Sequence, residues 1–447
     1  MNKNVIAIIV FLILLVIFAS AFSSSYTSHN ISNLAYVLAL GIDVGEKAKM
    51  KISAQFTNSD SFLSGSGSSD ESSNIVLVSS ESDSIYSCLN LINTYIGKEI
   101  NLSHCSIVIF SEEFAKNGIS SQIYSLLNNE EFRPTTNLVI STCDAYDYLN
   151  NVKPNLEKLT TIYYDTFSIT NKFTGYFSNI TVGDFFNTYS NPSCNSTAIL
   201  GGLDKTARQE ENSSSSTSSS TENNSSQNDS NSSDTSSDKE KKEDIYTVTT
   251  PEDLLAGTST VEGKRGSENI GIAVFEGDKF KGELTAIETI CHLLINNDID
   301  SCIISIDNPY KESESNTEEK LELILTPVKK AKITVKIEDN IPHIYVKIAV
   351  RASILTLVNN INYEEKDVLE KFSDVTKDYM KKEFNSYFNK ISREYETDID
   401  CFSTKALAYF PTINDWNNYN WSEKFKDAKF DININIDSIS SMLLTKI

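Results

Sequence analysis

The 447-residue chain has the composition of a globular protein, because 40% hydrophobic and 10% aromatic residues can fill the cores of about three domains of ~150 residues. Its 39 Lys and Arg against 61 Asp and Glu give a net charge of −22, which repels phosphate backbones and argues against nucleic-acid binding. The four histidines are scattered singly, so they offer little material for a metal cage or a histidine acid/base centre.

The N-terminus is an uncharged apolar run at residues 5–22, which follows Lys3 and ends with Ala-Ser-Ala at 19–21. A run of this length fits the apolar region and cleavage site of a signal peptide, whereas ~20 residues span a bilayer comfortably as a helix. Residues 1–25 are therefore predicted to be a signal peptide or an uncleaved membrane anchor. In either case we expect the rest of the chain to be delivered across the membrane.

Residues 26–153 alternate strand and helix patterns and are predicted to form an N-terminal α/β domain. The two segments 35–44 and 50–56 are typical of a hairpin. Apolar residues at steps of three and four from Ile85 to Ile96 indicate an amphipathic helix. The remaining expected elements are strands at 74–78, 105–110 and 137–141, a helix ending near 127 and a short helix before 154.

Residues 154–307 are predicted to form a middle α/β domain with a disordered Ser-rich insert at 205–244. Within the insert, residues 210–238 contain no apolar side chain, so they cannot bury enough surface to offset their ordering entropy. The expected elements are a helix around Phe185, strands at 197–201, 270–275, 280–284 and 301–305, and a helix at 285–295.

Residues 308–447 are predicted to form the C-terminal domain. Alternating apolar residues indicate three consecutive strands of an antiparallel meander, at 321–325, 333–337 and 344–350. A long amphipathic helix at 364–395 follows, and a strand at 430–436 is expected to return to the same sheet. The predicted fold class is α+β or mixed α/β, with three domains in which mixed or antiparallel sheets pack against helices.

The seven cysteines are odd in number and contain no C-x-x-C, so they define neither a zinc site nor a full disulfide framework. Most are expected to be free. They stand at positions 88, 105, 143, 194, 291, 302 and 401.

The sequence contains no Walker-type phosphate loop, no H-E-x-x-H, no calcium loop and no G-x-S-x-G. Two D-I-D repeats, at 298–300 and 398–400, could each offer paired carboxylates, but such repeats are as common in solvated turns and have no positioned base or metal partner here. We therefore predict no catalytic, cofactor-binding or metal-binding residue. Trp416 and Trp421 are expected to form a half-buried cap over the sheet, with a partner-facing groove as the alternative.

Several segments together resemble the Ger(x)C family, the C subunits of nutrient germinant receptors of spore-forming bacteria. The likeness is carried by residues 31–35 leading into Leu-Gly-Ile-Asp at 40–43, by Phe-Arg-Pro at 132–134 before a strand, and by the strand, Gly-Asp, strand signature at 272–284. The order and spacing of the C-terminal meander, long helix and final strand agree with it as well.

This resemblance implies a non-enzymatic receptor subunit without cofactors, on the outer face of the spore inner membrane, working with integral membrane A and B subunits. Family members are usually lipoproteins, but Ser25 stands where their acylated Cys is expected, and serine cannot accept the thioether-linked lipid. Membrane attachment would therefore require an uncleaved helix at residues 5–22. The alternative function is an extracytoplasmic solute-binding or cell-wall-associated protein. An enzyme such as a wall hydrolase is a third hypothesis.

Overall fold

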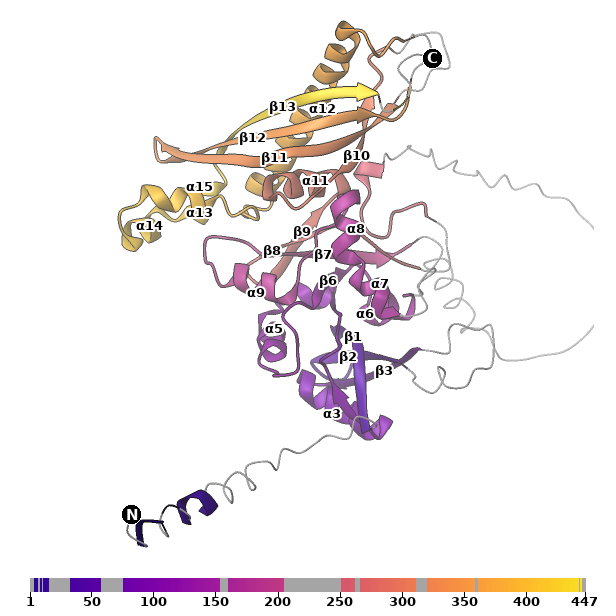
Figure 1. The fold of residues 1–447 in the computed structure, drawn as a ribbon, viewed down its shortest axis with the longest axis vertical. Helices are drawn as coiled ribbons and strands as arrows, with labels where there is room; N and C mark the ends of the chain where they lie inside the picture. The colour runs from indigo at the N-terminus through magenta and orange to yellow at the C-terminus, as the bar shows by residue number, and fades with distance from the viewer. Residues whose placement is uncertain are drawn as a thin grey trace, which may run out of the picture.

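Two β-sheets, each packed against helices, build the protein in the computed structural model (Figure 1). The structure describes residues 4–6, 9, 11–15, 33–57, 75–152, 160–204, 251–261, 266–310, 320–357, 361–441 and 443. The predicted insert at 205–244, Ser25 and much of the predicted membrane segment lie outside these residues. None of the helices within the described ranges is long and apolar enough to cross a membrane.

The first sheet has nine strands in the order β3-β2-β1-β5-β6-β7-β8-β9, and β4 pairs with β1. Its centre, from β1 through β5 and β6 to β7, is parallel, and its two flanks are antiparallel. The strands are β1 (Leu34–Val44), β2 (Met50–Thr57), β3 (Ile75–Ser82), β4 (Glu99–Asn101), β5 (Ile107–Ser111), β6 (Asn137–Ser141), β7 (Thr197–Leu203), β8 (Ser267–Glu276) and β9 (Lys279–Leu284).

Helices cover both faces of this sheet, which is why its central strands are nearly continuous apolar runs. One face packs with α3, α4, α5 and α9, and the other with α6, α7 and α8. Alternate residues of β5 divide between the two cores, with Val108 on the first and Ile109 on the second. The helices are α3 (Ile85–Ile96), α4 (Glu112–Ala115), α5 (Ser120–Leu127), α6 (Ala145–Asn150), α7 (Thr160–Asp165), α8 (Phe167–Thr174) and α9 (Val182–Tyr189).

The second sheet has four strands in the order β10-β11-β12-β13, and β13 is parallel to β12. The final strand therefore returns to the same sheet, as predicted. The strands are β10 (Cys302–Asp307), β11 (Lys320–Glu338), β12 (Ile341–Ile354) and β13 (Lys429–Ser441). The helices are α11 (Ala286–Asn296), α12 (Lys366–Asn389), α13 (Ser403–Ala406), α14 (Ile413–Tyr419) and α15 (Trp421–Phe425), with short helical turns at Pro251–Asp253, Lys390–Glu394 and Leu407–Tyr409.

The prediction of separate strands at 321–325 and 333–337 was wrong, because both belong to the single strand β11. No turn separates them, since β11 stays paired with β12 across register shifts between Pro327 and Lys332. The meander is formed instead by β10, β11 and β12. The turn between β11 and β12 places Asp339 and Asn340 in the left-handed region, which Asp and Asn tolerate better than other side chains.

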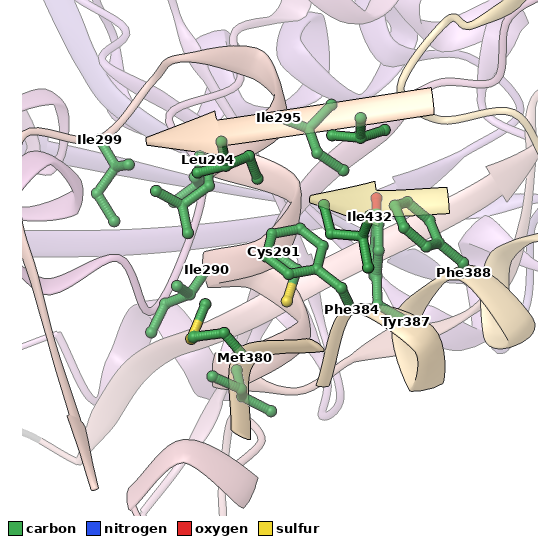
Figure 2. Packing of buried hydrophobic residues seen from close by; sticks show 14 of the residues in the cluster. Ile290, Cys291, Leu294, Ile295, Ile299, Met380, Phe384, Tyr387, Phe388 and Ile432 are labelled. Carbon is green, nitrogen blue, oxygen red and sulfur yellow. The ribbon is translucent and has the colours of Figure 1, made fainter. Parts of the chain in front are cut away.

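Helix α11 lies between the two sheets and gives them a shared core (Figure 2). Its residues from Ala286 to Ile295 are all buried, as expected of a helix that is enclosed on every side. The core cluster around it joins Ile272 and Leu284 of the first sheet to Phe384 of α12 and to the apolar face of the second sheet. The two sheets therefore pack as one body through α11.

The sheets do not follow the expected domain boundaries. Strands from both predicted ranges, 26–153 and 154–307, join in the first sheet, while β10 at the end of the second range belongs to the second sheet. Mixed sheets packed against helices confirm the coarse fold class. The division into three domains stays a prediction.

Candidate functional site

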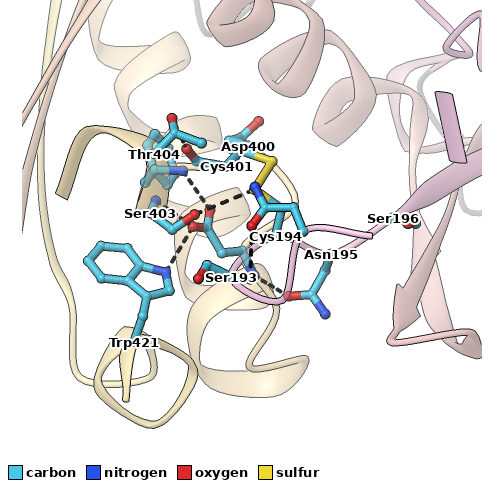
Figure 3. The surroundings of a disulfide bond; sticks show 12 residues. Ser193, Cys194, Asn195, Ser196, Asp400, Cys401, Ser403, Thr404 and Trp421 are labelled. Atoms are coloured by element: carbon cyan, nitrogen blue, oxygen red, sulfur yellow. Dashed lines mark hydrogen bonds between the residues drawn. A yellow bond between two sulfur atoms is a disulfide. The ribbon is translucent and has the colours of Figure 1, made fainter. Parts of the chain in front are cut away.

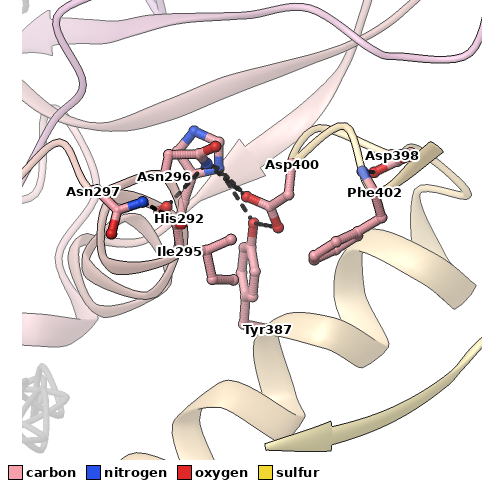
Figure 4. Close-up of polar contacts among 8 residues, drawn as sticks. All are labelled: His292, Ile295, Asn296, Asn297, Tyr387, Asp398, Asp400 and Phe402. Carbon is pink, nitrogen blue, oxygen red and sulfur yellow. Dashed lines mark hydrogen bonds and ion pairs between the residues drawn. The ribbon is translucent and has the colours of Figure 1, made fainter. Parts of the chain in front are cut away.

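A buried polar network lies where α11 meets the end of α12 and the loop at residues 395–404 (Figure 4). At its centre, the Asp400 Oδ1 atom is 2.8 Å from His292 Nδ1 and accepts a hydrogen bond of 2.8 Å from Asn296 Nδ2. The Tyr387 hydroxyl donates to Asp400 Oδ2 at 2.8 Å. Burial, followed by the neighbouring Asp400 charge, raises the pKa of Tyr387 well above its usual value, so this hydroxyl stays protonated as the donor.

A second buried carboxylate, Asp398, stands two residues away. It accepts hydrogen bonds from the Trp421 indole nitrogen at 2.9 Å and from the backbone N–H groups of Phe402 and Ser403 at 2.9 and 2.8 Å. Burial raises the pKa of Asp398 to about 7, and the charge of Asp400 acts in the same direction against the three donors. The 398–400 repeat is thus a pair of enclosed carboxylates rather than a solvated turn.

A disulfide between Cys194 and Cys401 ties this loop to the segment that precedes β7 (Figure 3). The same segment is joined by hydrogen bonds from the Asn195 N–H to the Asp398 carbonyl at 3.0 Å and from the Trp416 indole to Ser193 at 3.1 Å. The five remaining cysteines stand outside any disulfide, consistent with the expectation that most are not paired. The two bonded cysteines are 207 residues apart, a distance at which sequence spacing gives no signal.

A cavity of about 510 Å³ opens beside the network, between the end of α11, β11 and residues 400–405. Its polar lining includes Asn296, Asn297, Lys332, Asp400, Thr404 and Lys405. Two lysines and two side-chain amides could bind a small anionic or amide-bearing molecule. No three His, Cys, Asp or Glu side chains gather closely enough to hold a metal ion within the described ranges.

The His292–Asp400 pair has the geometry that orients an imidazole in catalytic triads. Here, however, the Asp400 side chain is fully enclosed and already accepts from Tyr387 and Asn296. Among the described residues, no Ser or Cys side chain is hydrogen-bonded to the imidazole of His292. The network therefore fixes the position of α11 against α12 and the 395–404 loop, and it offers no assembled nucleophile.

The other D-I-D repeat lies apart from this network. Asp298 pairs with Lys172 of α8 at a partly exposed position, and the backbone N–H of Asp300 donates to the Lys172 carbonyl at 2.8 Å. This repeat holds α8 against the loop between α11 and β10. Both tryptophans are more buried than expected, because Trp416 and Trp421 stack on each other with ring centroids 5.7 Å apart.

The Leu-Gly-Ile-Asp segment of β1 positions α6. Asp43 accepts hydrogen bonds from the N–H groups of Ala145 and Tyr146 at 2.7 and 3.1 Å, so a strand residue caps the start of a helix distant in sequence. A Cβ atom added at Gly41 would lie 3.1 Å from side-chain atoms of Ala145 and Leu149. Glycine at this position therefore lets α6 approach the strand closely.

The Phe-Arg-Pro segment and the Gly-Asp turn have similar roles. The Pro134 carbonyl accepts from the N–H of Gly183 at 2.8 Å, which fixes the start of α9, and Phe132 fills the core beside it. Asp278, in the turn between β8 and β9, accepts from the hydroxyl and N–H of Ser120 at 2.6 and 3.2 Å and so caps α5. The three segments that carried the resemblance act as long-range helix anchors.

Comparison with known families finds a matching family for each half of the chain. Residues 27–205 match the family described as "Spore germination protein N-terminal domain", and residues 270–441 match "Spore germination B3/ GerAC like, C-terminal". The chain belongs to the Ger(x)C family of spore germination proteins. Among solved structures, the "Crystal Structure of the GerBC protein" is similar over 90% of this chain and 96% of that chain, at 15% identity and a TM-score of 0.46. No curated protein matches the sequence.

The two matched parts of this Ger(x)C chain meet inside the first sheet rather than between the sheets. The N-terminal match ends just after β7 and the C-terminal match begins in β8, yet β7 and β8 are antiparallel partners. The Cys194–Cys401 disulfide also joins one residue from each matched part. Both halves are therefore needed to complete the first sheet, and the disulfide ties the N-terminal half to the loop that carries Asp398 and Asp400.

The sequence pattern singled out only one part of this network, the repeat at 398–400. His292 and Asn296 are missed because they lie more than 100 residues before Asp400 in the chain. Tyr387 lies 13 residues before it, and only the packing of α11 on α12 brings all four side chains together. The regular apolar spacing of the two helices is the sole sequence signal for that packing.

Proposed function

We propose that this Ger(x)C protein is the non-enzymatic C subunit of a nutrient germinant receptor and acts at the outer face of the spore inner membrane with integral membrane A and B subunits. The observation that carries the proposal is the match of both halves of the chain to spore germination families. A net charge of −22 suits an exported body that is kept off anionic surfaces until its partners hold it.

The buried polar network around Asp398 and Asp400 supports a structural rather than a catalytic role. Asp398 and Asp400 are enclosed and accept hydrogen bonds from Trp421 and Tyr387, respectively. A catalytic pair would need carboxylates or an imidazole open to a substrate. The network instead holds α11, which lies between the two sheets, against α12 and the 395–404 loop, as a subunit that transmits contacts between partners requires.

Membrane attachment in this proposal depends on residues 5–22 being kept as an uncleaved helix. Ser25 replaces the cysteine that would carry a lipid in related chains, so acylation at that position is not available. Intact-mass analysis of the membrane fraction tests this step. Retention gives the mass of the uncleaved chain, whereas a mature N-terminus after Ala21 would contradict it.

Affinity purification of the tagged full chain from spore inner membranes tests the receptor assignment. The proposal predicts that two multi-pass membrane proteins co-purify in amounts comparable to the chain. A chain recovered alone under conditions that keep other membrane complexes intact would contradict it.

The cavity beside Asn296 and Lys332 favours a second candidate, an extracytoplasmic solute-binding or cell-wall-associated protein. This alternative requires a small ligand held by convergent polar groups. A thermal-shift screen of amino acids, sugars and organic anions separates the two functions. A saturable hit that is lost in the Lys332→Ala variant, together with the absence of co-purifying membrane subunits, would favour solute binding.

A further inference from the structure

Helix α3 has an unusual surface for this acidic chain. Although 22% of all residues are charged, the twelve residues Ile85–Ile96 include no Asp, Glu, Lys or Arg. Leu91 and Tyr95 are 53% and 80% exposed, and their spacing of four places them on one face of the helix. The helix therefore presents an uncharged, partly apolar surface to its surroundings.

Edge strand β3 adds an exposed Val76 to this surface. Val78 packs against the core that holds α3, and Val76, two residues earlier, faces the same side of the sheet. The Ser80 hydroxyl donates to the Cys88 carbonyl at 2.9 Å, which fixes the alignment of the helix on the strand. From that contact, four residues back along β3 and seven residues forward along α3 each cover about 10 to 13 Å, so Val76 and Tyr95 reach the same end of the layer.

We call Val76, Leu91 and Tyr95 the apolar end. It lies where the chain enters the fold, because Leu34 at the start of β1 pairs with Glu99, just beyond α3 (Figure 1). Residues 23–33 alone separate the apolar N-terminal run from Leu34, and a chain of this length spans at most about 40 Å. A membrane helix at residues 5–22 would thus hold the apolar end close to the bilayer.

We propose that the apolar end lies in the lipid interface of the membrane and sets the orientation of the whole body on it. This inference rests on the membrane attachment in the proposed function. An uncharged surface avoids the repulsion that anionic headgroups exert on the rest of the chain, and tyrosine is a preferred side chain at headgroup depth. Because the anchor already confines the body to the surface, a contact of three side chains is sufficient to orient it.

Quenching by brominated lipids tests this contact. The full chain carrying Tyr95→Trp is reconstituted into vesicles of phosphatidylcholine and phosphatidylglycerol, with and without bromine on the acyl chains. We expect brominated lipid to remove most of the fluorescence added by the tryptophan at position 95. Tyr95 is exposed, so the substitution should leave the fold intact.

The matched control is Ile413→Trp. Ile413 is 77% exposed on α14, beside the second sheet and away from α3 (Figure 1), and its added fluorescence should be unaffected. The native Trp416 and Trp421 are buried and are present in both variants, so each variant is compared with the wild-type chain in the same vesicles.

Vesicle flotation tests membrane attachment of the chain separately from the lipid contact of the apolar end. If the chain floats with the vesicles and the tryptophan at position 95 is not quenched, the lipid contact is wrong and attachment stands. If quenching is equal at positions 95 and 413, the body has no fixed orientation and the inference is also overturned. A full chain that does not float overturns both the inference and the membrane attachment.

Discussion

The indole nitrogen of Trp421 donates a hydrogen bond of 2.9 Å to the buried carboxylate of Asp398, and this contact connects the α14–α15 region to the loop that carries the disulfide. Hydrogen bonds to charged groups are worth more than neutral ones, and their loss leaves a buried acceptor short of a donor.

Replacing Trp421 by Phe removes the donor to Asp398, which should cost about 2 kcal/mol of unfolding free energy in addition to the cost of the smaller ring. Trp416→Phe is the matched control, because it loses the same part of the ring system while its indole donates to the neutral hydroxyl of Ser193, so its total cost should be lower by about 1 kcal/mol. Urea unfolding of both variants at about pH 8.5, above the pKa of Asp398, gives the comparison. Equal costs would show that the charge of Asp398 contributes nothing to the contact.

The stability of the chain should depend on pH through Asp398. Burial raises its pKa in the folded chain to about 7 from the usual 3.8, so between these values the folded state keeps a proton that the unfolded state has lost. The stabilising contribution of protonated Asp398 to the free energy of unfolding is fully present below about pH 4. It decreases as the pH rises through about 7 and is then constant, and the whole change is on the order of a few kcal/mol.

Asp398→Asn isolates this effect from that of other carboxyl groups. The amide cannot ionise, so the difference in unfolding free energy between the wild type and the variant should shift against the wild type from pH 4.5 to pH 7.5. Urea unfolding at a series of pH values measures it. Parallel curves for the two proteins across this range would contradict the assignment.

Thiol counting tests the disulfide. Alkylation of the denatured chain should modify five cysteines without a reductant and seven after reduction. Removing the bond with Cys194→Ser and Cys401→Ser should cost about 2 to 5 kcal/mol of stability, because it closes a long loop. Seven reactive thiols in the unreduced, denatured protein would show that the pair is not bonded.

Gly282 should be intolerant of a side chain because of Tyr395. A Cβ atom there would lie 2.5 to 2.6 Å from the Tyr395 ring and hydroxyl, whose oxygen is held by the Glu283 backbone N–H and carbonyl. Gly282→Ala should cost about 1 to 3 kcal/mol. In the Tyr395→Leu background the same substitution should cost much less, and a fully additive double variant in thermal unfolding would argue against the contact.

Local periodicity was enough to predict the elements whose burial is set by near neighbours. The hairpin of β1 and β2, helix α3, the long α12 and the returning strand β13 all stand where their apolar spacing indicates. Long-range pairing decided the rest. Residues 326–332 contain Pro327 and three lysines and show no strand alternation, but β12 pairs along them and makes β11 continuous.

The buried polar network could not be predicted from the sequence for the same reason. The apolar neighbours of His292 in α11 indicate that it is buried, but nothing local identifies Asp400 as its partner, because only the packing of α11 on α12 and the 395–404 loop brings the two together. Seven cysteines allow many pairings, and Cys194–Cys401 is selected by the fold. The three segments that resemble the Ger(x)C family, in contrast, could be identified from the sequence. In the structure they fix the starts of α5, α6 and α9.

The most direct measurement of the central claim is the germination response of spores that lack this chain. If the chain is a germinant receptor subunit, its deletion should abolish the response to one class of nutrient and leave the other responses intact. Expression of the full-length chain should restore the lost response. Unchanged germination with amino acids, sugars and salts would contradict the assignment.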